Sequence, residues 1–143
     1  MSRKKILVVE DDPDVRQGMH LRLEANDYEV SFAADVVSSV IAARKHEPDL
    51  IILDLGLPAG DGFLVIERLK VVPALAVIPI IVVSARAGLA NQERAVAAGV
   101  KAFLQKPVDN DELLAVIRQI LGGPAEPERP AFASKPNRSK VLL

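Results

Sequence analysis

The chain has 143 residues, half of them hydrophobic, and a formal net charge of −1 from 18 basic and 19 acidic side chains. This near balance gives no basic surplus of the kind that attracts phosphate backbones, so we expect no direct binding of nucleic acid. The absence of cysteine excludes disulfides, thiolate zinc sites and cysteine nucleophiles, and no apolar run reaches the roughly 20 residues that span a bilayer, so we expect a cytoplasmic protein without a membrane partner.

Five short apolar runs predict β-strands, because several of them are rich in β-branched residues. The runs at 6–9 and 80–83 are apolar throughout, which is typical of strands covered on both faces, as in a parallel sheet. Stretches with helical spacing separate the strands. The alternation predicts an α/β fold in which a doubly wound, five-stranded parallel sheet is covered by five helices. The expected strands are 6–9, 28–33, 50–53, 78–83 and 102–104.

Capping signals mark the starts of two of these helices. Asp12 precedes Pro13 at the first helical position, and apolar side chains follow at helical spacing. Asp109 followed by Glu112 has the spacing of a capping box before the last helix. The third and fourth helices, expected at 63–70 and about 91–98, have the weakest boundary signals.

The composition changes after residue 121. Glycine and proline become frequent, no apolar period remains, and residues 122–143 carry four basic and two acidic side chains. Such a segment is typical of a linker or tail. We therefore expect one domain at 1–121 and a Pro/Gly-rich flexible tail or linker at 122–143.

Polar side chains follow four of the five predicted strands. In a doubly wound sheet, ligands bind beyond the carboxyl ends of the strands, where the strand order reverses. Residues that are far apart in the sequence are therefore expected to meet at one edge of the sheet. They are Glu10, Asp11 and Asp12 after the first strand, Asp54 after the third, Ser84 after the fourth and Lys106 after the fifth.

These residue types suit a magnesium-dependent phosphoryl-transfer site. Mg²⁺ prefers oxygen ligands in octahedral geometry, and Asp11 and Asp54 can supply two carboxylates. Lys106 and the metal would offset the negative charge that otherwise repels an incoming phosphoryl group, and Ser84 offers a hydroxyl. Phosphoryl transfer depends mainly on positioning and charge stabilisation, which needs neither histidine nor cysteine at the site.

Each of these residues alone has an ordinary structural interpretation. The acidic run 10–14 could cap a helix, Asp54 could end a buried strand, Ser84 could belong to a turn and Lys106 could be solvated. Their joint placement at the same ends of four strands favours a shared site.

Four motifs of this chain, in this order, resemble those of the receiver domains of response regulators in two-component signalling, over about residues 4–121. The resemblance implies a flavodoxin-like receiver fold and a phosphoaspartate switch. The motifs are the first strand with its acids at 6–13, the acceptor loop at 53–58 with 60–62, the strand end at 83–85 and the segment 103–107.

The resemblance also implies roles for single residues. Asp54 would be the phosphoacceptor and a metal ligand, Asp11 a direct ligand of Mg²⁺, and Glu10 an outer-shell acid, with Mn²⁺ as a substitute metal. The backbone carbonyl of Gly56 would complete the protein ligands. Lys106 would hold a phosphoryl oxygen, and its peptide bond to Pro107 is expected to be cis. Asp12 falls outside the acidic pair of the family motif.

The expected switch couples Asp54 to a distant surface. By analogy with the family, phosphorylated Asp54 draws the Ser84 hydroxyl inward, and Phe103 moves into the vacated space. This changes the surface formed by the fourth helix, the fifth strand and the fifth helix. Phe103 lacks the hydroxyl of the tyrosine common at this position. Lys101 and Ala102 replace two acids of relatives that dimerise on DNA, and Arg86 and Gly56 occupy positions that tune phosphoryl lifetime.

The implied phosphoryl donor is a histidine kinase or a histidine phosphotransfer protein. The downstream partner is unknown, and we expect a monomer or a weak, phosphorylation-dependent dimer. The chain would not be an enzyme with an external product, because at most it would catalyse its own phosphorylation and dephosphorylation. It would be a stand-alone receiver or the receiver part of a larger regulator or hybrid kinase.

Three other functions are less consistent with the sequence. A pseudo-receiver that binds partners without phosphorylation is disfavoured because the acceptor, acids, hydroxyl and lysine are all present. A haloacid-dehalogenase-like phosphatase needs a second acid two residues after the nucleophile, where this chain has Gly56. A dinucleotide-binding domain needs a glycine-rich turn after the first strand, where this chain has the acidic run 10–12.

Overall fold

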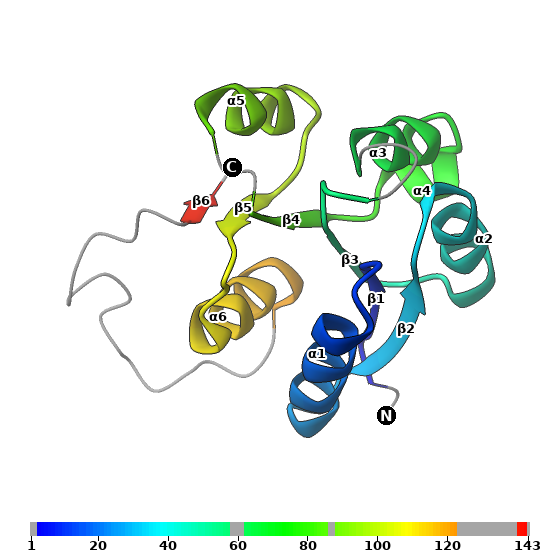
Figure 1. Ribbon diagram of the computed structural model, residues 1–143. Helices are drawn as coiled ribbons and strands as arrows, with labels where there is room; N and C mark the ends of the chain where they lie inside the picture. Colours follow the sequence, from blue (N-terminus) through cyan, green and yellow to red (C-terminus); the bar gives the residue numbers. More distant parts are fainter. Residues whose placement is uncertain (1–2, 58–61, 86–87, 123–139, 143) are drawn as a thin grey trace.

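The computed structural model describes residues 3–57, 62–85, 88–122 and 140–142, and all described strands belong to one sheet (Figure 1). Five of the strands are parallel and lie in the order β2-β1-β3-β4-β5. The predicted five-stranded parallel sheet is therefore confirmed. The strands are β1 (Lys5–Val9), β2 (Glu29–Ala33), β3 (Leu50–Leu53), β4 (Ile80–Ser84) and β5 (Ala102–Gln105).

Helices lie on both faces of the sheet. The side chains of β1 alternate between two hydrophobic clusters, since Ile6 and Val8 pack with α1 and α6, whereas Leu7 and Val9 pack with α2, α3 and α5. This doubly wound arrangement agrees with the prediction and explains why strands such as β1 are apolar throughout. The helices are α1 (Pro13–Ala25), α2 (Val36–His46), α3 (Gly62–Lys70), α4 (Pro73–Ala76), α5 (Leu89–Ala97) and α6 (Asn110–Leu121).

Helix α4 has no counterpart among the predicted helices, and the described residues contain six helices in place of the expected five. Pro73 occupies the first turn of α4, where proline is tolerated, but a four-residue helix shows no apolar period that a sequence pattern could reveal. The helices expected as fourth and fifth are consequently α5 and α6. The predicted bounds of α3 and α5 differ from the observed ones by one or two residues.

A sixth strand, β6 (Lys140–Leu142), pairs antiparallel with β5 at the edge of the sheet. It falls in the segment expected to be a flexible tail, and the sequence analysis did not predict it. The rest of that segment, residues 123–139 and 143, lies outside the described residues. The proposed division at residue 121 stays a prediction.

Local hydrogen bonds explain where three helices begin. The Asp12 carboxylate accepts hydrogen bonds from the backbone N–H groups of Asp14 and Val15, and that of Asp109 accepts one from Glu112, so both residues cap their helices as predicted. The reciprocal bond of the capping box predicted for Asp109 and Glu112 stays a prediction. A capping box that the sequence analysis did not predict starts α2, where the Asp35 carboxylate accepts a hydrogen bond of 2.8 Å from the backbone of Ser38.

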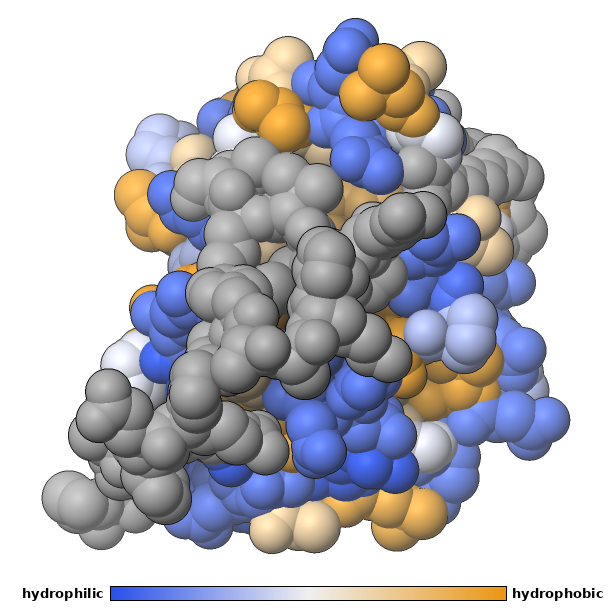
Figure 2. Space-filling model, turned by 90° about the vertical axis from the view of Figure 1, so that its left-hand side faces the viewer, coloured by the Kyte–Doolittle hydropathy of each residue, from blue (hydrophilic) through white to orange (hydrophobic). Residues whose placement is uncertain are grey.

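Hydrophobic residues on the described surface are mostly separated from one another on the side that bears α6. Figure 2 shows this side, which is on the left in Figure 1, and its hydrophobic patches alternate with hydrophilic ones. None of the described helices combines the length and the apolar character that crossing a bilayer would require.

Candidate functional site

The strand order reverses between β1 and β3, and acidic residues follow both strands. Val9 pairs with Leu53 in the parallel register, so Glu10 and Asp54 leave the sheet side by side. The Asp54 N–H donates to the carbonyl of Val9 at 3.0 Å, and the Glu10 N–H donates to that of Ala33 at the same distance. Because these bonds extend the sheet by one residue, both acids have fixed positions at the carboxyl edge.

Glu10, Asp11 and Asp54 form an acidic cluster at this edge. One carboxylate oxygen from each residue lies within 4.8 Å of the others. Glu10 and Asp54 are buried, with 2% and 9% of their surface exposed, whereas Asp11 is exposed. A cluster of oxygen donors that is open on one side fits a hard cation such as Mg²⁺, which keeps part of its water shell.

Lys106 supplies the positive charge of the site. Its Nζ donates to Glu10 Oε1 at 2.6 Å and to Asp54 Oδ2 at 3.3 Å. The lysine reaches this position because its backbone N–H continues the pairing of β4 and β5 by donating to the carbonyl of Ser84 at 3.0 Å. The Lys106–Pro107 peptide bond is cis. The ends of β1, β3 and β5 are thus joined through one ammonium group.

The pKa values of Glu10 and Lys106 are both raised. Burial raises the pKa of the Glu10 carboxyl above its ordinary value and outweighs the hydrogen bond from Lys106, which lowers it. Burial alone would lower the pKa of the Lys106 ammonium, but the hydrogen bond to Glu10 and the charge of Asp54 outweigh burial and raise it. Lys106 therefore remains a cation at neutral pH between two acids.

Two glycines allow the chain to turn close to Asp54. The Gly56 N–H donates to Asp54 Oδ1 at 3.0 Å and orients the carboxylate. At Gly62, the first residue of α3, a Cβ atom would lie 2.6 Å from the carbonyl oxygen of Asp54, so only glycine fits without a backbone shift. The acceptor-loop residues between these glycines that the sequence analysis named, Pro58, Gly60 and Asp61, lie outside the described residues, as does Arg86.

Ser84 and Phe103 are buried on neighbouring strands, with 0% and 2% of their surface exposed. Phe103 pairs with Val82 in the β4–β5 register, and Ser84 is two residues after Val82. Because side chains two residues apart point to the same face of a sheet, Ser84 and Phe103 share the face that α3 and α5 cover. This places them where the expected switch requires, but their roles as a switch remain a prediction.

Asp12 stabilises the start of helix α1. Its carboxylate caps α1, and its backbone N–H donates to Glu10 Oε2 at 3.2 Å. This agrees with the motif comparison, which placed Asp12 outside the acidic pair.

Two arginine contacts, one of them with the site residue Glu10, were not predicted from the sequence. Arg16 Nη1 donates to the backbone carbonyl of Glu10 at 3.4 Å, and the Arg94 guanidinium of α5 lies 3.9 Å from the centroid of the Phe63 ring of α3. Arg16 follows Asp12 by one helical turn, a spacing that suggests a pair with Asp12 and not the observed hydrogen bond to the Glu10 carbonyl. The contact between Arg94 and Phe63 joins two helices and leaves no local pattern in the sequence.

The sequence of this chain is similar to those of several known proteins. The sequence model of the family described as "Response regulator receiver domain" matches residues 6–118. The chain is 35% identical over 117 residues to the DNA-binding dual master transcriptional regulator RpaA of Synechocystis sp., covering 82% of this chain and 48% of that protein. It is 37% identical over 116 residues to the KDP operon transcriptional regulatory protein KdpE of Escherichia coli, covering 81% and 50%. The chain spans about half the length of these relatives.

Solved structures show the same fold. A putative response regulator from Chloroflexus aurantiacus superposes with a TM-score of 0.79 at 29% identity, covering 85% of this chain and all of that one. The receiver domain of a sensor histidine kinase from Pseudomonas aeruginosa, solved with a magnesium ion coordinated in its active-site cleft, gives a TM-score of 0.77 at 28% identity, covering 85% and 100%.

Proposed function

Because this chain belongs to the response-regulator receiver family of two-component systems, we propose that it accepts a phosphoryl group on Asp54 in a Mg²⁺-dependent reaction. The observation that carries the proposal is the meeting of Lys106 with Glu10 and Asp54 at the carboxyl edge of the sheet, at 2.6 and 3.3 Å. Asp11 completes the acidic cluster. This set provides an acceptor, oxygen donors for a cation and a positive charge.

In the proposed transfer, an oxygen of Asp54 attacks the phosphorus of a phosphohistidine. An O–P bond forms, the P–N bond breaks, and the imidazole leaves with its bonding electrons and takes up a proton. The hydrogen bond from Gly56 N–H to Oδ1 orients the carboxylate, and the Lys106 ammonium stabilises charge on the phosphoryl oxygens.

Asp11, Asp54 and the backbone carbonyl of Gly56 would hold Mg²⁺, or Mn²⁺ in its place, and Glu10 would act from the outer shell. When bound, the cation would offset the negative charge of the acids and of the incoming phosphoryl group.

Phosphorylation would be read out at the α5-β5-α6 surface. The Ser84 hydroxyl and the Phe103 ring share one face of the sheet, so a shift of the first toward Asp54 changes the space available to the second. This transmits a local charge change to the helix α5 and the strand β5. A partner that binds the shifted arrangement better would favour the phosphorylated state.

The proposed donor is a histidine kinase or a histidine phosphotransfer protein. The chain acts as a switch and at most catalyses its own phosphorylation and dephosphorylation, as a cytoplasmic monomer or weak phosphorylation-dependent dimer without direct contact to nucleic acid. RpaA and KdpE are named as transcriptional regulators, and the matched residues make up about half of each of these proteins. A role within a larger regulator is therefore compatible with the proposal, as is a stand-alone receiver.

Beryllofluoride and acetyl phosphate test the proposal. With Mg²⁺, we expect beryllofluoride to shift amide resonances near Asp54 and acetyl phosphate to add one phosphoryl group by mass spectrometry. Asp54→Asn should respond to neither reagent, and chelation of Mg²⁺ should remove both effects. A wild-type chain that responds no more than Asp54→Asn would instead be a pseudo-receiver.

A further inference from the structure

Helix α2 has two apolar faces. One face is buried against the sheet through Val36, Ala42 and Ala43. A second stripe of residues, with the spacing i, i+3, i+4 and i+7, lines a hollow beside α3. A helix that is apolar on most sides is normally covered on most sides, so this stripe is unusual on a surface. Its apolar residues are Val37, Val40 and Ile41, and Arg44 completes the spacing.

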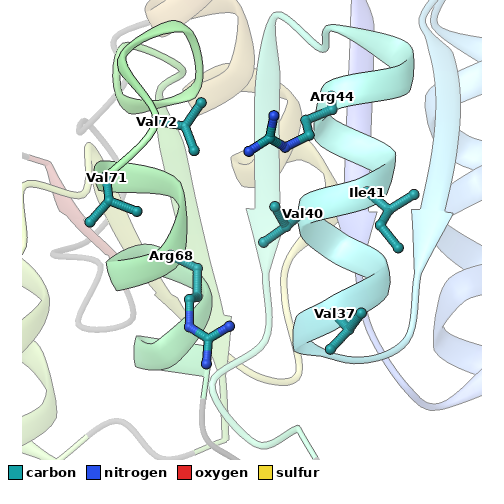
Figure 3. A pocket seen from close by; sticks show the side chains of 7 residues that line it. All are labelled: Val37, Val40, Ile41, Arg44, Arg68, Val71 and Val72. Atoms are coloured by element: carbon teal, nitrogen blue, oxygen red, sulfur yellow. The ribbon is translucent and has the colours of Figure 1, made fainter.

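The stripe forms one wall of a groove of about 300 Å³ between α2 and α3 (Figure 3). The opposite wall includes Arg68 of α3 and Val71, which follows that helix. Val37, Ile41 and Val71 are 66%, 60% and 78% exposed. Exposed apolar residues that gather around a hollow typically mark a binding surface, whereas single ones do not.

The groove is also basic. Figure 3 shows the guanidinium of Arg44 at one end, toward Val72, and that of Arg68 at the other end, toward Val37. Neither arginine forms an ion pair or a hydrogen bond with any residue that the structure describes. Lys45 and Lys70 add positive charge to α2 and α3, whose only acid is Glu67. Two guanidinium groups that have no ion-pair partner among the described residues, beside apolar side chains, fit a partner that presents carboxylates.

Charge and shape narrow the choice of occupant. A second copy of this chain, docked through the same groove about a two-fold axis, would bring Arg44 and Arg68 of both copies together, and like charges at an interface are unfavourable. A flat membrane surface would not fill a hollow between two helices. An amphipathic helix can lay an apolar stripe into such a groove while acidic residues on its flanks pair with the arginines.

We propose that the α2–α3 groove is a docking site for an amphipathic, acidic helix of a partner protein. The site is separate from the α5-β5-α6 surface of the proposed switch, since α5 and α6 contribute no residue to it. The chain would thus hold a partner at one place and report its phosphorylation state at another.

Two synthetic peptides test this proposal with the full chain. Both have leucines at i, i+3, i+4 and i+7 and differ only in flanking residues, which are glutamates in one and lysines in the other. We expect the glutamate peptide to shift the amide resonances of α2 and the 68–72 segment saturably, and the lysine peptide to leave them unchanged. The double variant Arg44→Glu/Arg68→Glu should bind the glutamate peptide about tenfold more weakly than the wild-type chain does.

The double variant Lys45→Glu/Lys70→Glu is the matched control, because it changes the net charge equally on the same helices but outside the groove. It should weaken binding much less, and thermal unfolding should show that both double variants are folded. Equal effects of the two double variants, or no saturable shifts, would refute the proposal. Binding to phosphatidylglycerol vesicles without peptide binding, or a dimer lost in Val37→Asp, would also refute it in favour of a membrane or a second copy.

Discussion

Lys106 donates a hydrogen bond of 2.6 Å to Glu10, although 96 positions separate the two residues in the sequence. The Glu10 side chain is only 3% exposed and that of Lys106 is 22% exposed. A buried carboxylate is costly without a partner, so the lysine stabilises Glu10 whether or not a cation or phosphoryl group is bound.

Lys106→Met is therefore expected to lower the free energy of unfolding at neutral pH by about 1.5–3 kcal/mol, because it leaves Glu10 without its charged donor. Urea unfolding in the absence of Mg²⁺ measures this difference. Lys101→Met makes the same change at an exposed position next to β5 and should have almost no effect. If both variants lose the same stability, Lys106 does not stabilise Glu10.

Asp11→Asn is expected to weaken Mg²⁺ binding about 10-fold or more, because a carboxylate of the acidic cluster is lost. The chain has no tryptophan, so amide resonances during a Mg²⁺ titration are a suitable readout. Asp12→Asn is the control, since asparagine caps a helix as well as aspartate does and Asp12 caps α1. A larger effect of Asp12→Asn would show that the metal ligand has been assigned to the wrong residue.

Gly62→Ala is expected to cost at least about 2 kcal/mol of stability, because its Cβ would lie 2.6 Å from the Asp54 carbonyl oxygen and 2.8 Å from Leu55 Cα. Gly18→Ala, within α1, meets no atom within 4 Å and should stabilise the chain by about 0.5–1 kcal/mol. Thermal unfolding of both variants tests this contrast. Stabilisation in both would mean that α3 shifts to make room.

The stability difference between wild type and Asp35→Asn should depend on pH. Hydrogen bonds from Ser38 hold the pKa of Asp35 below its ordinary value of 3.8, so the ionised form favours the folded state. Its contribution is present above pH 3.8 and is lost as the pH falls through the lower folded-state pKa. Melting temperatures at several pH values measure the difference. In a Ser38→Ala background, the stability difference caused by Asp35→Asn should be smaller. A stability difference that grows as the pH falls would contradict the lowered pKa of Asp35.

Much of the fold could be predicted because the strands are covered on both faces. Runs such as 50–53 and 80–83 are apolar throughout, and the helical stretches between them leave few alternatives to a parallel sheet. The meeting of Asp54 with Lys106 followed from the same argument, since all five parallel strands end at one edge. The family resemblance also proved right, as the match over residues 6–118 shows.

Other features depend on tertiary contacts that no local pattern records. The clash that requires glycine at position 62 involves the backbone of Asp54, which a single sequence does not locate. The contact between Arg94 and Phe63 joins two separate helices. Helix α4 and strand β6 have four and three residues, too few to show a period of 3.6 or of 2.

Strand β6 also changes which backbone groups of the sheet are open to other molecules. Without it, β5 would be an outer strand, and its unpaired N–H and C=O groups could pair with a neighbouring chain and promote aggregation. With β6 in place, the open edge on that side is a strand of only three residues, and short edge strands are poor templates for such pairing. A recombinant fragment cut after residue 121 would uncover β5, so the full chain is the better choice for crystallisation and for work at high concentration.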